Sequence, residues 1–417
     1  MDWVAPLIVL VAIGVFWRLP TAAARRTLLL ISTLVLSGFM IWQLIPGLDQ
    51  RPLDRIIVTL GLSVADILLV VVTVGIAQRA RRGQRGLVWI GLSLLIGVFI
   101  LSKWPAAWTA LQQPILSLLQ QPAGSAIPST AWLGLSYLLF RLLHVLLEAR
   151  KGQLPDLDWR GMVIYALFPA SLIAGPIDRW PRFKSDLDHL DQPFRADHVS
   201  NGAWRLLVGA FKKFVLADFL AQLPLNLAAY PRVTPIPMLW LTLYAYGFLI
   251  YFDFSGYTDM AIGAARLIGF QLPENFNAPY LKTNLARFWQ AWHITLSSWA
   301  RDYVFFPLAR TLRSRIKWLP SNAAALMCHL ATMIVIGLWH GLAWTFVAWG
   351  VWHALGLFGV KVWGDFTRPR HLHGSRWTSA LGMFITFNFV MLGWVFFSAP
   401  DLPTAITNFG KLFGVRL

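Results

Sequence analysis

Cysteine is nearly absent from this chain of 417 residues, which contains only Cys328. A single cysteine excludes an intramolecular disulfide framework and any metal site built from several thiolates. Cys328 lies in an apolar run, where a lone cysteine usually packs as a small hydrophobic side chain. A covalent role, in which its thiolate accepts an acyl group, is the alternative.

Charged residues are also scarce, at 13% of the chain, whereas soluble domains average about 25%. Hydrophobic residues make up 57% and gather in runs close to the roughly 20 residues that cross a bilayer as a helix. Their uniform apolarity excludes the alternating pattern of a membrane β-barrel. The sequence therefore predicts an all-α polytopic membrane protein with about 10–12 transmembrane helices.

The expected spans are distributed along the whole chain. The clearest are residues 3–17, 27–46, 56–77, 87–102, 130–147, 161–176, 236–252, 323–340, 342–362 and 379–398, while 200–222 and 257–270 are ambiguous. No Gly/Ser-rich linker divides them, so we expect one domain over residues 1–417, with a helical scaffold in 1–150 and a catalytic core in 161–400.

Acidic residues are outnumbered by basic ones, 19 to 36, which gives a formal net charge of +17. The basic residues cluster after the first, third and fifth expected spans, as they do in cytoplasmic loops, so we expect an extracytoplasmic N-terminus. Asp2 precedes the first apolar run where a signal peptide would carry Lys or Arg, which favours an uncleaved first span. Because the charge is scattered over separate loops, we expect no nucleic-acid partner.

The segment Gly337-Leu-Trp-His340-Gly341 places an imidazole in an expected span. Ionisable groups at membrane depth are rare and usually functional. Its two glycines have the small-xxx-small spacing that lets helices approach closely. A neutral imidazole can take a proton from a hydroxyl, so His340 is a candidate general base. The alternative is a histidine that only hydrogen-bonds between helices. Three further histidines lie in apolar segments: His144, His329 and His353.

A second histidine, His293, lies in a block crowded with aromatic and charged side chains. Its neighbours include Trp292, Trp299, Arg301 and Asp302. These residues cannot all share one helical face, so we expect some to line an aromatic channel that binds substrate and others to pack. Enrichment of Trp and Tyr at membrane interfaces is the alternative explanation.

The stretch 253–280 is rich in residues that break helices or bond to the backbone through side chains. Asp253 and Asp259 are a possible metal-binding pair, but without a further ligand at suitable spacing we favour a structural turn and expect no metal site. Asn275 and Asn277 follow, and together with Trp339 they complete the candidate substrate-binding residues.

Five segments, in order along the chain, resemble motifs of the membrane-bound O-acyltransferase family. They are Asp253-Phe-Ser-Gly-Tyr257, Glu274-Asn-Phe-Asn-Ala-Pro-Tyr280, Phe288-Trp-Gln-Ala-Trp-His-Ile-Thr-Leu-Ser297, Arg301-Asp-Tyr303 and Gly337-Leu-Trp-His-Gly341. The segment Ala174-Gly-Pro-Ile-Asp-Arg179 is most similar to the bacterial Dlt-type D-alanyl transfer branch. The tail 401–414 is more similar to the alginate and cellulose O-acetylation branch.

The resemblance implies a ring of helices around a central extracytoplasmic funnel and a cytoplasmic tunnel. It makes His340 the essential histidine and His293 the second polar residue of the active centre. It implies no bound cofactor, and a donor thioester on the phosphopantetheine arm of a small acidic carrier protein, or acetyl-CoA. The implied acceptor is an extracytoplasmic glycopolymer, with envelope proteins as further partners.

We therefore expect an O-acyltransferase of the bacterial cytoplasmic membrane that moves a D-alanyl group to an envelope glycopolymer, with His340 as general base. Acetylation of an exopolysaccharide such as alginate or cellulose is the alternative within the same chemistry. A transporter or flippase is the alternative from another class, because intramembrane histidines and broken helices also occur in such proteins. A third alternative is a non-catalytic scaffold, whose function would not change when either histidine is substituted.

Overall fold

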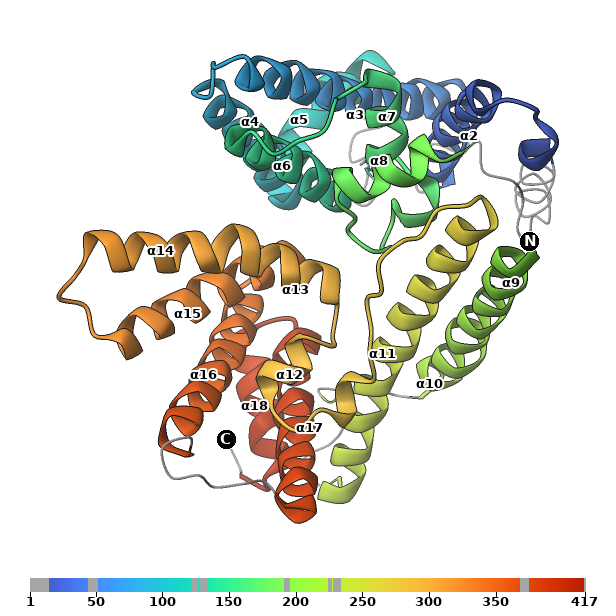
Figure 1. Ribbon diagram of the computed structural model, residues 1–417. Helices are drawn as coiled ribbons and strands as arrows, with labels where there is room; N and C mark the ends of the chain where they lie inside the picture. The colour runs from blue at the N-terminus through green and yellow to red at the C-terminus, as the bar shows by residue number, and fades with distance from the viewer. Residues whose placement is uncertain are drawn as a thin grey trace. The chain divides into compact units, whose positions relative to one another are not determined.

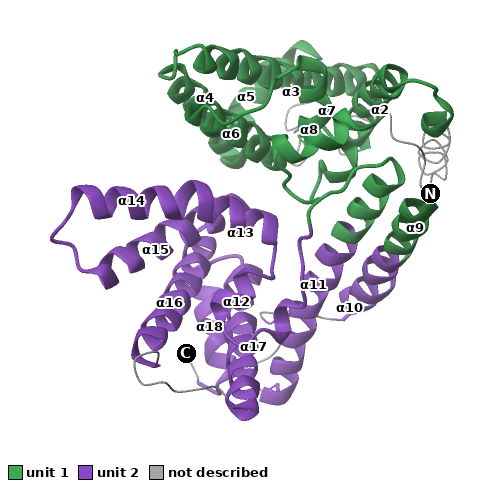
Figure 2. Cartoon of the chain, viewed as in Figure 1, with its two compact units in different colours: residues 1–207, 258–273 green, residues 208–257, 274–417 purple. Residues whose placement is uncertain are grey.

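The computed structural model describes residues 15–43, 52–121, 127, 132, 134–190, 196–223, 227, 234–367 and 375–415, which form helices and connections without a β-strand (Figure 1). Two compact units divide the chain: unit 1 is residues 1–207 and 258–273, and unit 2 is residues 208–257 and 274–417 (Figure 2). Most of the expected span 3–17, and parts of 27–46 and 130–147, lie outside the described residues.

Six helices of the described residues are long and apolar enough to cross a membrane. They are α2 (Ala22–Gln43), α3 (Pro52–Arg81), α11 (Ile236–Leu267), α15 (Ser321–His340), α16 (Trp344–Thr367) and α17 (Arg376–Ser398). A further candidate is the pair α4 (Leu87–Lys103) and α5 (Pro105–Leu118), bent by 91°. The bend falls at Trp104, which is extended because a residue that precedes a proline disfavours the helix. The chain is thus a multi-pass, all-α membrane protein, as predicted.

Unit 1 is built around α6 (Leu135–Lys151), which packs against both α3 and α4. Its apolar side chains are buried on several faces, and Leu142, Val145 and Leu146 are fully enclosed. The unit also contains α7 (Trp159–Ala166), the short 3-10 helix η3 (Pro169–Ser171) and α8 (Trp180–Asp188). It ends with most of α9 (Ala196–Ala210) and the last turns of α11.

The expectation of one span over residues 161–176 is wrong, because α7 ends at Ala166 and η3 follows it. Pro169 interrupts the helix, which leaves backbone carbonyls without helical partners. The buried guanidinium of Arg141 in α6 meets them: it donates to the carbonyl oxygens of Tyr165 (3.0 Å), Ala166 (2.8 Å) and Ser171 (2.7 Å). One arginine therefore stabilises a break that the apolar pattern conceals.

Unit 2 contains the elements that carry both candidate histidines. After α11 come η6 (Pro279–Leu281), α12 (Leu285–Trp289), α13 (Ile294–Ala300), the π-helical η7 (Arg301–Phe305), α14 (Phe306–Arg315), the helices α15 to α17 and finally α18 (Leu402–Leu412). The α15–α16 hairpin has the closest packing. A Cβ added to Gly337 would strike the Phe346 carbonyl, and one added to Gly350 would lie 2.6 Å from the Met333 carbonyl oxygen. The predicted close helix approach is therefore present at Gly337, whereas Gly341 lies beyond the end of α15.

The segment from Asp253 to Asp259 is helical, and the turn expected there is wrong. It forms part of α11, where the two carboxylates form separate ion pairs. Asp253 pairs with Lys213 of the π-helical η4 (Phe211–Ala217), and Asp259 pairs with Arg205 of α9 at 2.8 Å. Each carboxylate has a cationic partner, and this explains how the acidic residues are accommodated in so long a helix.

We expect Gly350→Ala to destabilise the protein because the new methyl group must push α15 and α16 apart, an overpacking that typically costs about 1–3 kcal/mol. Gly359→Ala on the same helix is the matched control, since a Cβ there meets no atom within 4 Å. Thermal unfolding in detergent micelles measures both. A melting temperature for Gly350→Ala at or above that of Gly359→Ala would contradict the close packing described here.

Candidate active site

His293 lies at a sharp turn between α12 and α13. Its backbone is left-handed, with φ 42° and ψ 54°, and its carbonyl accepts the first helical hydrogen bond of α13 from the Ser297 N–H (2.9 Å). A non-glycine residue in this region is uncommon, and such residues cluster at functional sites. The imidazole is buried, with the ring of Phe254 from α11 at 4.8 Å between centroids.

Asn275 anchors this turn to the preceding extended segment. It is completely buried, and its Oδ1 accepts hydrogen bonds from the backbone N–H (3.1 Å) and the hydroxyl (2.8 Å) of Thr295. Its backbone carbonyl accepts from the Ile294 N–H (3.0 Å). Asn275 therefore acts as a cap for the first turn of α13, supplied from a distant part of the chain.

The same carboxamide orients the imidazole of His293, whose Nδ1 lies 3.3 Å from Asn275 Oδ1. Because the Thr295 N–H can only donate, the atom that it meets must be the carboxamide oxygen. Nδ1 is then a protonated nitrogen, and in the neutral imidazole Nε2 carries the lone pair. This tautomer is assigned from the hydrogen-bond network.

His340 is the last residue of α15 and is half-buried among aromatic rings. Its ring centroid lies 4.8 Å from Phe397, 5.6 Å from Trp349 and 5.9 Å from Phe346. These rings come from α16 and α17. Together with α15, which carries His340, three membrane helices therefore meet at the imidazole.

Trp339 connects the two histidines. Its ring centroid lies 5.8 Å from that of His293 and 4.5 Å from that of His340. The two imidazoles, far apart in sequence, thus contact one indole. Trp292 packs nearby, 5.1 Å from Phe276 and 5.4 Å from Trp394.

The other candidate residues make contacts along neighbouring elements. Arg301 pairs with Asp302 (3.0 Å) at the start of η7, and its side chain is 54% exposed. Trp299 packs on Tyr303 at 5.1 Å. The side chain of Asn277 is exposed, and its backbone N–H donates to the Ala291 carbonyl (3.0 Å). The contacts among His293, Asn275, Trp339 and His340 therefore define the candidate site most closely.

The sequence model of the membrane-bound O-acyltransferase family matches residues 83–399, which include every residue of this site. This chain belongs to that family. The matched range also includes α4 to α17, so the match covers most of both units.

Curated relatives of this chain carry several substrate names. The chain is 33% identical over 283 residues to a teichoic acid D-alanyltransferase of Streptococcus thermophilus, and the alignment covers 64% of this chain and 68% of the relative. It is 32% identical over 345 residues to a probable alginate O-acetylase of Pseudomonas aeruginosa, covering 80% and 61%. It is 37% identical over 261 residues to a peptidoglycan O-acetyltransferase of Helicobacter pylori, covering 60% and 47%. The chain thus spans about half to two thirds of the length of these relatives.

Several residues of the candidate site were not singled out from the sequence. Phe346 follows His340 closely in the chain, and the short connection between α15 and α16 would have been enough to place it nearby. No sequence pattern indicated Thr295, Trp349 or Phe397, because their contacts depend on how α13, α16 and α17 pack.

Two other buried histidines accept hydrogen bonds within the protein, as expected for histidines that only stabilise the packing. His144 Nε2 accepts from the Trp180 backbone N–H (3.2 Å), and His353 Nδ1 accepts from the Trp289 indole N–H (3.3 Å).

Cys328 is buried on α15, and the 1.5 Å rise per residue places it roughly 18 Å before His340 along the helix axis. Its thiol is therefore remote from that imidazole.

Asn275→Ala should destabilise the acyltransferase by about 1–3 kcal/mol, because it leaves two buried donors of Thr295 without their acceptor. Asn277→Ala is the control, and a change within about 0.5 kcal/mol is expected at that exposed side chain. Thermal unfolding of both purified variants provides the comparison. Equal melting temperatures for the two variants would show that the carboxamide of Asn275 does not hold the turn.

Proposed function

We propose that this acyltransferase moves a D-alanyl group from a cytoplasmic thioester to a hydroxyl of an extracytoplasmic envelope glycopolymer. It would act in the cytoplasmic membrane of a bacterium, with its N-terminus outside. The observation that carries the proposal is the contact of His293 and His340 with one indole, Trp339, in a family of O-acyltransferases. The D-alanyl group is favoured by the similarity to a teichoic acid D-alanyltransferase.

His340 acts as the general base in this proposal. Its neutral imidazole takes the proton from the acceptor hydroxyl while that oxygen attacks the thioester carbonyl carbon. The tetrahedral intermediate then collapses with cleavage of the C–S bond, and the thiolate leaves and takes the proton from the imidazolium. The products are an ester and a free thiol. Proton transfer of this kind contributes roughly 10²–10⁴-fold to the rate.

His293 orients the acceptor in the same scheme. Asn275 fixes the lone pair on Nε2, so this nitrogen can accept a hydrogen bond from a sugar or polyol hydroxyl. A strained backbone and a buried carboxamide hold the imidazole in one orientation. Such fixed geometry is what general-base catalysis between two bound substrates requires.

Trp349 Nε1 and Asn275 Nδ2 are among the buried donors near the histidines that have no hydrogen-bond partner within the described part of the chain. Leaving a buried donor unpaired costs about 1–3 kcal/mol, so such a group in a native protein needs an explanation. Trp349 lies against His340, and we assign its indole N–H to the oxyanion of the tetrahedral intermediate.

The acyl donor in this proposal is a thioester on the phosphopantetheine arm of a small acidic carrier protein, which the basic cytoplasmic loops would attract. The acetylating alternative, with acetyl-CoA as donor and an exopolysaccharide as acceptor, is kept because the alignment to a probable alginate O-acetylase covers 80% of this chain.

Purified protein in vesicles tests this function directly. Radiolabelled D-alanyl carrier thioester is supplied on the side that carries the basic loops, and glycerol-phosphate polymer on the other. Covalent label on the polymer supports the proposal, and label transfer from acetyl-CoA alone identifies the acetylating alternative. Label that crosses the vesicle without covalent attachment identifies a transporter and overturns it.

We expect His340→Ala to reduce transfer in this assay by about 10²–10⁴-fold while expression, membrane insertion and melting temperature stay near wild type. His189→Ala is the matched control, because that histidine is exposed at the end of α8. Transfer by His340→Ala at the level of His189→Ala would remove His340 from the mechanism.

Trp349→Phe should keep the ring that packs on His340 but remove the proposed oxyanion donor. Loss of one such donor lowers kcat by about 10²–10³-fold. Trp352→Phe on the same helix is the control, since its indole N–H donates to the Phe389 carbonyl (3.0 Å). Comparison of kcat and KM separates the two, and equal kcat in both variants would exclude the assignment.

A further inference from the structure

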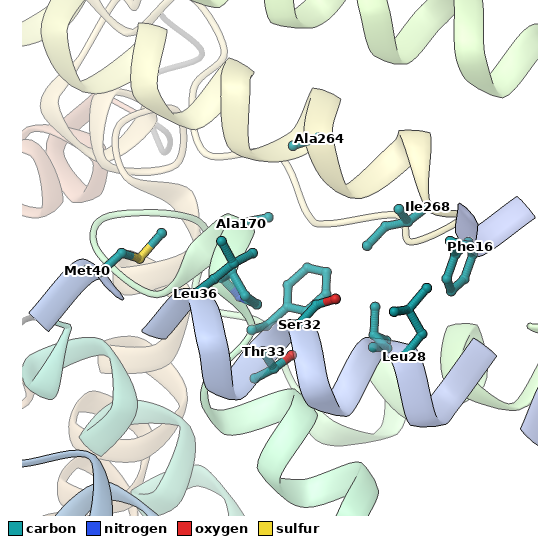
Figure 3. A pocket seen from close by; sticks show the side chains of 12 residues that line it. Phe16, Leu28, Ser32, Thr33, Leu36, Met40, Ala170, Ala264 and Ile268 are labelled. Atoms are coloured by element: carbon teal, nitrogen blue, oxygen red, sulfur yellow. The ribbon is translucent and has the colours of Figure 1, made fainter. Parts of the chain in front are cut away.

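A groove of about 240 Å³ runs along α2 within unit 1 (Figure 3). Its floor is a stripe of residues four apart on α2: Leu28, Ser32, Leu36 and Met40. Residues with this spacing lie on one face of a helix. The opposite walls come from the 168–170 segment, from Ala264 in the last turns of α11 and from Ile268, which directly follows that helix.

We propose that this groove binds one acyl chain of an anionic phospholipid, with the headgroup at the N-terminal end of α2. The proposal does not depend on the acyl-transfer reaction, because it concerns only unit 1 and a bound lipid of the surrounding bilayer.

The shape of the groove fits an extended chain. The stripe from Leu28 to Met40 spans roughly 18 Å at 1.5 Å per residue. Its four side chains are neither fully buried nor fully exposed, which places them between the enclosed face of α2 and its outer face. A long, narrow, apolar groove parallel to a membrane helix matches one acyl chain better than a compact ligand.

The surroundings of the groove select lipid over water. Apolar cavities of this kind stay dry and accept apolar guests. On the outer face of α2, Ile31, Leu34 and Val35 are exposed, as expected for a helix that faces hydrocarbon. An acyl chain is thus the most abundant apolar partner at this depth.

Cationic side chains gather at one end of the groove. The guanidinium of Arg25 lies 5.8 Å from the ring centroid of Phe16, which lines the groove; it is buried and donates to the carbonyls of Leu19 (3.1 Å) and Leu190 (2.6 Å), so it adds positive charge rather than a free donor. Arg26, next to it, pairs with Asp188 (3.0 Å), and Arg18 is exposed two residues after Phe16. A phosphate is attracted to such a cluster, and basic groups at the membrane surface recognise anionic lipids in this way.

Photo-crosslinking with full-length protein in vesicles tests the proposal. Phosphatidylglycerol with a diazirine in its acyl chain is compared with phosphatidylcholine carrying the same chain, and labelled peptides are mapped by mass spectrometry. We expect label on α2 and on the 168–170 segment, and stronger label from phosphatidylglycerol. Equal labelling by both lipids, or no label on these segments, would overturn the proposal.

Leu36→Trp should fill the groove and reduce the label on these segments about tenfold, because several methylenes lose their site. Leu34→Trp is the matched control, since that residue lies on the exposed face of the same helix. Ala170→Leu fills the opposite wall and replaces Leu36→Trp if the latter does not fold. Equal labelling in the filling and control variants would contradict the groove as the site.

A substitution of Arg18 tests the assignment of the lipid headgroup to the N-terminal end of α2. Arg18→Gln should lower the preference for phosphatidylglycerol towards the level of phosphatidylcholine, while label from phosphatidylcholine stays unchanged. An unchanged preference would overturn the assignment of the anionic headgroup to this end of α2.

Discussion

Backbone polar groups at membrane depth must find partners inside the protein, and this constraint governs where the chain departs from helix. Two buried side chains meet it. Arg141 donates to the carbonyls left open where α7 ends, and Asn275 accepts from the backbone N–H and hydroxyl of Thr295 at the start of α13. Each lets an irregular segment exist among apolar helices, and the second of these segments carries His293.

The aromatic surroundings of His340 follow from the same packing. Short connections and a close glycine contact bring α15 and α16 together, and α17 adds Phe397 against the imidazole. Three rings from α16 and α17 thus contact the imidazole of His340. Trp339, adjacent to His340 in sequence, brings His293 into the same group through one indole.

The spans with uninterrupted apolar runs could be predicted, since length and hydrophobicity alone specify them. Two predictions failed where side-chain chemistry overrode composition. The run at 161–176 is broken because Pro169 and Arg141 together make the break stable. The segment from Asp253 to Asp259 stays helical because Lys213 and Arg205 neutralise carboxylates that, read alone, predicted a turn.

The sequence by itself determined the membrane class, the helical fold and the family, because composition and the histidine motifs are local properties of the chain. It also named His340, His293, Asn275 and Trp339. It did not separate the buried Asn275 from the exposed Asn277, and it gave no hydrogen-bond partners for His144 and His353. Only the tertiary structure decided these, because burial and hydrogen bonding depend on which side chains pack together.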